Sequence, residues 1–113
     1  MTCSNGTGMR NYRILPINDW ALRQMIAYFG DRLTLLQPPV RPEQALADQA
    51  SGMQAIGRAY VDALSAETGV RYVADFGDRL HLDDPADFPE SCDHLGSVPA
   101  RQVVARAIVD LLK

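Results

Sequence analysis

The sequence predicts an α/β fold with parallel strands, and three observations support this class. Two short apolar segments, at residues 32–37 and 70–76, have the composition of buried strands. A long helical pattern separates them, which is the connection that parallel neighbours require. The chain has 113 residues, 47% apolar and 22% charged, as is typical of a single globular domain that needs neither a metal nor a disulfide for stability.

The first helix is expected over residues 19–29, in "NDWALRQMIAYFG". Asn18 is the expected N-cap because asparagine side chains accept hydrogen bonds from first-turn N–H groups, and Gly30 is the expected C-terminal stop. The next segment, "RLTLLQPP", is short and apolar, and its prolines cannot continue a β ladder. It predicts a buried strand over residues 32–37. The apolar face of the helix consists of Leu22, Met25, Ile26 and Phe29.

A long helix is expected over residues 43–68. Pro42 suits the first helical position, and Gly69 suits the position after the last turn. Two glycines inside this pattern, Gly52 and Gly57, are expected to weaken or bend the helix. Its apolar stripe consists of Leu46, Ala50, Met53, Ile56 or Gly57, Tyr60, Val61 and Leu64.

The second strand is expected over residues 70–76, where Val70, Tyr72 and Val73 supply β-branched and aromatic side chains. The strand, helix and strand together predict a right-handed βαβ unit. Residues 77–97 lack a sustained period and predict a long loop with at most one short helical turn, and long loops tend to be functional. The last helix is expected to start with Ser97 as N-cap and Pro99 in its first turn, with an apolar stripe of Val103, Val104, Ala107, Ile108, Leu111 and Leu112.

Composition excludes several classes of partner. Eleven Lys and Arg against 14 Asp and Glu give a net charge of -3, so we expect no nucleic-acid binding. No segment approaches the roughly 18 apolar residues that span a bilayer, so we expect no membrane insertion. Cys3 and Cys92 form no metal or disulfide framework, which predicts free thiols, no metal, no cofactor and a cytoplasmic location. An export signal on a longer parent protein would change this last expectation.

The stretch "PESCDHLGSVPARQ" places His94 on an acidic loop just before the last helix. In a parallel sheet, ligands and catalytic groups gather outside the carboxyl ends of the strands. Residues 38–42 and the acidic loop both leave from such ends, so we expect His94 to share a rim with residues 38–42. His81 is expected to alternate on a short extended segment. The nearby carboxylates predict a solvated loop and no calcium site; they are Asp78, Asp83, Asp84, Asp87, Glu90 and Asp93.

The order "LTLLQPPV", long helix, "GVRYVADFGD", acidic loop and "CDHLGSVPARQVVARAIVDLL" resembles the C-terminal half of the SGNH (GDSL-like) hydrolases, especially their cell-wall and polysaccharide acyl-transfer branch. The resemblance covers about residues 19–113. It implies a three-layer α/β/α fold with a flavodoxin-like parallel sheet, truncated to its C-terminal half. Residues 18–113 would be the partial domain, and residues 1–17 a flexible polar leader.

The resemblance also implies roles for residues of the acidic loop. His94 corresponds to the catalytic base, and the family's acid position, three residues earlier, holds Ser91. Since a serine cannot stabilise an imidazolium as a carboxylate does, Glu90 or Asp93 would have to supply the acid. The family's Gly-Asp-Ser nucleophile block is absent, and Ser4 follows no predicted strand.

Two functional hypotheses follow. In the first, the chain is the C-terminal part of an SGNH-type ester hydrolase or acyltransferase that carries the base, lacks the nucleophile and is inactive alone. In the second, it is a small α/β interaction protein that binds a partner or itself through an exposed sheet edge. The expected partners are a second copy of the chain or the missing N-terminal half.

Overall fold

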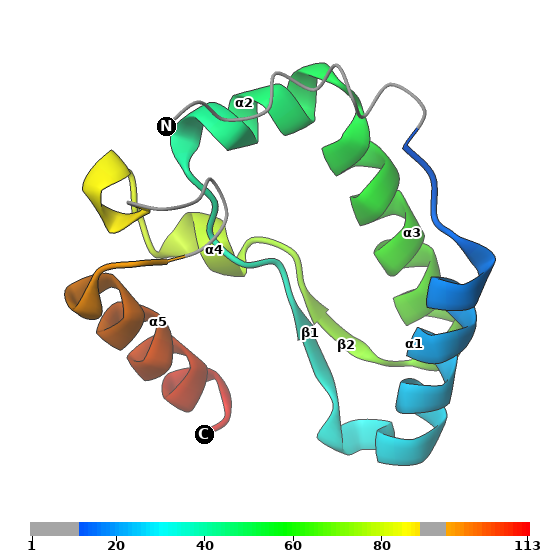
Figure 1. The fold of residues 1–113 in the computed structure, drawn as a ribbon. Coiled ribbons are helices and arrows are strands. Elements are labelled where there is room, and N and C mark those ends of the chain that lie inside the picture. Colours follow the sequence, from blue (N-terminus) through cyan, green and yellow to red (C-terminus); the bar gives the residue numbers. More distant parts are fainter. Residues whose placement is uncertain (1–11, 89–94) are drawn as a thin grey trace.

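The computed structural model describes residues 12–88 and 95–113, which form a helix-rich α/β chain (Figure 1). The five α-helices and two strands in these ranges are accompanied by the short 3₁₀ helices η2 and η3. In chain order the elements are α1 (Pro16–Phe29), η2 (Gly30–Arg32), β1 (Thr34–Leu36), α2 (Pro42–Ala50), α3 (Met53–Thr68), β2 (Arg71–Val73), α4 (Phe76–Arg79), η3 (Pro85–Asp87) and α5 (Val98–Leu111).

Strands β1 and β2 are parallel neighbours, as predicted. Thr34 lies opposite Arg71, Leu35 opposite Tyr72 and Leu36 opposite Val73. Each strand is shorter than its predicted segment, because Pro38 lacks the N–H needed to extend the ladder and the chain turns into α4 at Phe76. The α/β class is therefore confirmed, with a two-stranded parallel sheet in the described residues, while the three-layer arrangement stays a prediction.

The long helix predicted between the strands is two helices, α2 and α3, which run in different directions (Figure 1). Gly52 lies between them with a φ of 81°, a left-handed conformation that glycine adopts readily. The bend predicted at Gly52 is confirmed, whereas Gly57 lies within α3. The predicted stop is also confirmed, since Gly69 has a φ of 79° and its N–H donates to the carbonyl of Ser65.

Helix α1 begins earlier than predicted, and the prediction of Asn18 as its N-cap is wrong. The helix starts at Pro16, whose φ is already helical and whose missing N–H needs no partner at this position. Leu15 is the N-cap residue and makes no side-chain cap, while the N–H of Asn18 donates to the carbonyl of Leu15. The predicted stop at Gly30 is confirmed, with a φ of 59°.

One hydrophobic cluster of the core lies where α1 and α3 pack beside the strands. Ile26 of α1, Leu64 of α3 and Val70 before β2 are its buried members. Partly buried apolar side chains surround them, from Leu22, Leu33, Leu35 and Tyr60. The radius of gyration is 15.0 Å and the extents are 38 × 38 × 19 Å. A compact domain of this length would have a radius near ~13 Å, so this chain is flat and open.

The described residues between β2 and α5 contain more helix than the predicted loop, because both α4 and η3 lie there. His81 has a φ of 52°, so the extended alternation predicted for it is wrong. The start of α5 is as predicted: the hydroxyl of Ser97 accepts the N–H of Ala100 at 3.2 Å, and Pro99 lies in the first turn. Within residues 12–88 and 95–113, no helix has the length and apolarity needed to cross a membrane.

Candidate functional site

The carboxyl ends of the two strands are held side by side. The N–H of Gln37 donates to the carbonyl of Val73 at 3.2 Å, and the N–H of Gly77 donates to the carbonyl of Gln37 at 2.9 Å. A Cβ atom on Gly77 would lie 2.6 Å from the nitrogen of Pro39 and 2.7 Å from the carbonyl atoms of Pro38. Only glycine fits here, and its packing fixes the "QPP" segment against the start of α4.

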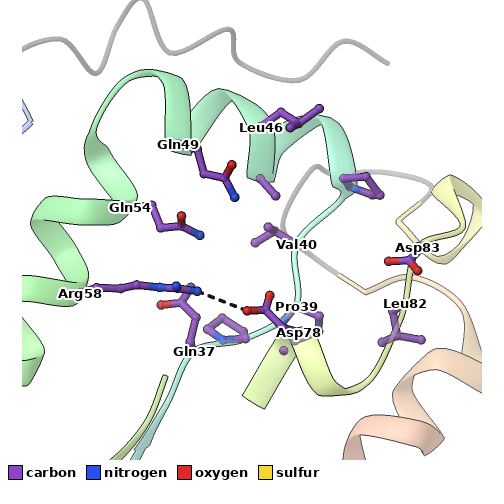
Figure 2. Close-up of a pocket in the computed structure, with 14 residues that line it drawn as sticks. Gln37, Pro39, Val40, Leu46, Gln49, Gln54, Arg58, Asp78, Leu82 and Asp83 are labelled. Atoms are coloured by element: carbon purple, nitrogen blue, oxygen red, sulfur yellow. Dashed lines mark hydrogen bonds and ion pairs between the residues drawn. The ribbon is translucent and has the colours of Figure 1, made fainter. Parts of the chain in front are cut away.

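A cleft of about 430 Å³ opens at these strand ends, between α2, α3 and the segment that begins with α4 (Figure 2). Such a volume lies in the range of small-molecule sites. Its apolar lining comes from Pro38, Pro39, Val40, Pro42, Ala45, Leu46 and Leu82. Its polar lining comes from Gln37, Gln49, Gln54, Arg58, Asp78 and Asp83. The rim predicted around residues 38–42 is therefore the wall of a cleft.

Arg58 supplies the positive charge of this cleft. Its side chain is 34% exposed, and one Nη atom donates to the Oδ2 of Asp78 at 3.4 Å, a long hydrogen bond (Figure 2). Since the side chain of Asp78 is 72% exposed, water screens this ion pair and it contributes little. The Nε atom of Arg58 is buried and has no hydrogen-bond partner within the described residues.

Three glutamine amides accompany the guanidinium. In the described part of the chain, no hydrogen bond is formed by the side chains of Gln37, Gln49 and Gln54. Gln44, on the same helix as Gln49, instead donates to the carboxylate of Asp48 at 2.6 Å. Figure 2 shows Gln49, Gln54 and Arg58 pointing from α2 and α3 toward the same space. These amides and the guanidinium are open to a ligand in the cleft.

The site residues predicted from the sequence do not belong to the described ranges. His94, its candidate acids Glu90 and Asp93, and Ser91 all lie between residues 88 and 95, outside the described residues. The same holds for Cys92, and also for Cys3 and Ser4 at the N-terminus. Their proposed roles stay predictions.

Two of the other carboxylates in the acidic loop stabilise local structure. Asp84 accepts the N–H of Ala86 at 2.9 Å and so caps η3. Asp87 accepts the hydroxyl of Ser97 at 2.9 Å, which ties the loop to the start of α5. Among residues 12–88 and 95–113, no group of three His, Cys, Asp or Glu side chains could hold a metal ion.

A second polar cluster joins α1 to α3, away from the cleft. The hydroxyl of Tyr60 donates to Asp19 at 2.6 Å, and Arg23 bridges Asp19 and Glu67. The hydrogen bond from Tyr60 holds the pKa of Asp19 below its usual value, and burial raises the pKa of Tyr60 to about 12. The cluster links two helices that are distant in sequence through hydrogen bonds and ion pairs, so its role is structural.

Sequence reasoning missed the polar side of the cleft. Gln49, Gln54 and Arg58 are polar residues on helices, where a periodic pattern identifies the apolar face and treats the rest as solvated. No local signal marks them, because Gln49 lies near the carboxyl end of α2, and α3 follows α2 instead of a strand. Comparisons of the chain with protein-family models, with curated proteins and with solved structures find no match.

Proposed function

We propose that the chain is the C-terminal part of an SGNH-like ester hydrolase or acyltransferase, with its ligand in the cleft and no activity when alone. The observation that carries this proposal is a cleft at the carboxyl ends of two parallel strands joined by a helical connection. Ligand sites of open parallel sheets occupy this position. The acidic loop predicted over residues 77–97 contains His94, and its first residues, Gly77 and Asp78 of α4, line the same cleft.

In this proposal His94 is a general base. It would take the proton from a serine hydroxyl supplied by another part of the enzyme and return it to the leaving group. The resulting imidazolium requires an anionic neighbour, so Glu90 or Asp93 would act in place of the serine at position 91. Without a nucleophile the base has nothing to activate, so the isolated chain should not turn over p-nitrophenyl acetate above background.

The test is an NMR titration of the two histidines, assigned with the variants His94→Gln and His81→Gln. A carboxylate beside His94 should raise its pKa above the ordinary value of about 6.5. Either Glu90→Gln or Asp93→Asn should then return the midpoint toward that value, which would identify the acid. An ordinary midpoint that neither variant moves would refute the catalytic role of His94. Ester turnover that Ser4→Ala abolishes would refute the inactivity of the chain.

A second candidate function is association with another polypeptide. It is favoured by a sheet that has only two strands among the described residues, since each strand then has one unpaired edge. Large apolar side chains are also exposed, including Ile17, Trp20, Tyr28, Leu46 and Leu112. Static light scattering at micromolar concentration should then show a dimer or larger species. A monomer that binds no hydrophobic dye would exclude this function.

A further inference from the structure

The cleft at the strand ends carries opposite charges on its two sides. Arg58 reaches into it from α3, and Asp83 lines it from the segment after α4 (Figure 2). Pro39 and Val40 lie between them, and Leu46 lines the cleft from α2 (Figure 2). A molecule that fits this arrangement has a negative end, a positive end and an apolar body.

The guanidinium of Arg58 has N–H donors that can bind a carboxylate. It has five N–H groups, and within residues 12–88 and 95–113 it makes one hydrogen bond, the 3.4 Å contact with Asp78. A guanidinium binds a carboxylate through two parallel hydrogen bonds, which are shorter and stronger than this contact. The side chain is about two thirds buried, so an ion pair formed here would be less screened than one on the surface.

The amides of Gln49 and Gln54 add neutral donors near the same cation. Neither is engaged by another side chain in the described part of the chain, and both line the cleft. Leu46, also in the lining, is 67% exposed and would be covered by an apolar ligand group. Burying apolar area of this kind stabilises a complex.

The opposite side of the cleft favours a cation. Asp83 is exposed and forms no hydrogen bond or ion pair with the rest of the described chain. Unlike Asp84 and Asp87, which stabilise turns, it has no local structural role. Its carboxylate can accept an ammonium group from a ligand whose carboxylate lies at Arg58.

We propose that this cleft binds a short zwitterionic peptide, with its C-terminal carboxylate at Arg58, its N-terminal ammonium at Asp83 and an apolar side chain over Val40 and Leu46. The volume of about 430 Å³ accommodates two residues. This inference goes beyond the proposed hydrolase role, because it requires neither His94 nor a nucleophile.

The experiment is a titration of the ¹⁵N-labelled full chain with leucyl-leucine up to roughly 10 mM, followed by amide shifts. Two analogues separate the ends: the N-acetylated dipeptide lacks the ammonium, and the dipeptide amide lacks the carboxylate. Saturable shifts should centre on Gln49, Gln54 and Arg58. The dipeptide amide should bind at least about tenfold more weakly than the dipeptide, as expected for loss of one charged pair.

Variants that remove a charge show which residue binds each end of the dipeptide. Arg58→Gln should weaken the dipeptide about tenfold, whereas Asp83→Asn should weaken the dipeptide and leave the N-acetylated analogue unchanged. Matched controls are Arg106→Gln and Asp62→Asn, which make the same charge changes outside the cleft. Arg58→Lys keeps the positive charge but lacks the planar pair of donors that binds a carboxylate, so it should give intermediate affinity for the dipeptide. This graded loss distinguishes a role of Arg58 in binding from a role in folding.

Three results would overturn the proposal: no saturable shift, equal binding of the dipeptide and its amide, or unchanged binding by Arg58→Gln. The dipeptide titration reports on Arg58 and Asp83, and the histidine titration reports on His94. Peptide binding can therefore fail while the hydrolase proposal stands, and the histidine titration can fail while peptide binding stands.

Discussion

Gly77 lies against the backbone of the two prolines that end the first strand, which makes Gly77→Ala a sharp probe of the cleft wall. The added Cβ would be 2.6 Å from the nitrogen of Pro39 and 2.7 Å from the carbonyl carbon and oxygen of Pro38. These atoms belong to rigid proline backbone, so no side chain can rotate away. Relief would require the hydrogen bond from Gly77 to Gln37, now 2.9 Å, to lengthen.

The magnitude follows from two opposing effects. Forcing a methyl group into a packed site destabilises a protein by about 1–3 kcal/mol. Alanine gains roughly 0.5–1 kcal/mol over glycine in a helix, and position 77 lies in α4. Because the obstacle is backbone, the upper part of the first range applies, and we expect Gly77→Ala to lower the free energy of unfolding by about 2 kcal/mol.

The assay is urea unfolding followed by far-UV circular dichroism, with Gly57→Ala as the control. Among the described residues, a Cβ on Gly57 meets only the hydroxyl of Tyr12, at 4.0 Å, so helix propensity should make this variant up to about 1 kcal/mol more stable. Gly77→Ala should lower the unfolding midpoint by about 1 M urea with an unchanged slope. A midpoint equal to or above that of the wild type would show that the prolines do not pack on Gly77.

The cluster between α1 and α3 gives the remaining predictions. Tyr60→Phe removes the 2.6 Å hydrogen bond to Asp19 and should lower the free energy of unfolding by about 1 kcal/mol, measured by the same urea assay; an unchanged midpoint would contradict it. A hydrogen bond from Tyr60 holds the pKa of Asp19 below its usual value, and one from Arg23 does the same for Glu67. The two ionised carboxylates therefore stabilise the fold above about pH 4, and this contribution is lost as the pH falls through their pKa values in the folded state. At the alkaline end, the pKa of Tyr60 is about 12 in the folded chain against an ordinary value of 10.0. The stability that its protonated hydroxyl contributes is therefore lost as the pH rises from about 10 to 12. If the urea midpoint of the wild type increases as the pH is lowered from about 5 to about 2, the acid-side prediction is refuted.

The order of the main elements and several of the helix ends could be predicted from the sequence alone. Gly30 and Gly69 end helices, and Gly52 separates α2 from α3. Each of these glycines has a positive φ, a conformation that is unfavourable for residues with a Cβ atom. Ser97 caps α5 because its hydroxyl reaches an N–H only three residues away. The parallel pairing followed as well, because a helical connection between two short strands permits it. The helix ends and the cap depend on interactions within a few residues.

Where two local signals compete, the sequence pattern was not decisive. Asn18 is a good capping residue, but Pro16 starts the helix two residues earlier and leaves Asn18 inside the first turn. His81 sits between two leucines as a strand residue would, yet it has a left-handed backbone conformation just after α4. Its N–H donates to the carbonyl of Asp78, so the preceding turn fixes its conformation.

Which distant residues meet depends on the tertiary structure. Tyr60 and Asp19 are 41 positions apart, and nothing in either local pattern pairs them. Gly77 faces Pro38 and Pro39 because the parallel register brings both strand ends to the same edge of the sheet. Arg58 enters the cleft because the break at Gly52 sets the direction of α3. Periodicity shows which face of a helix is polar, but the packing of the other elements determines what that polar face meets.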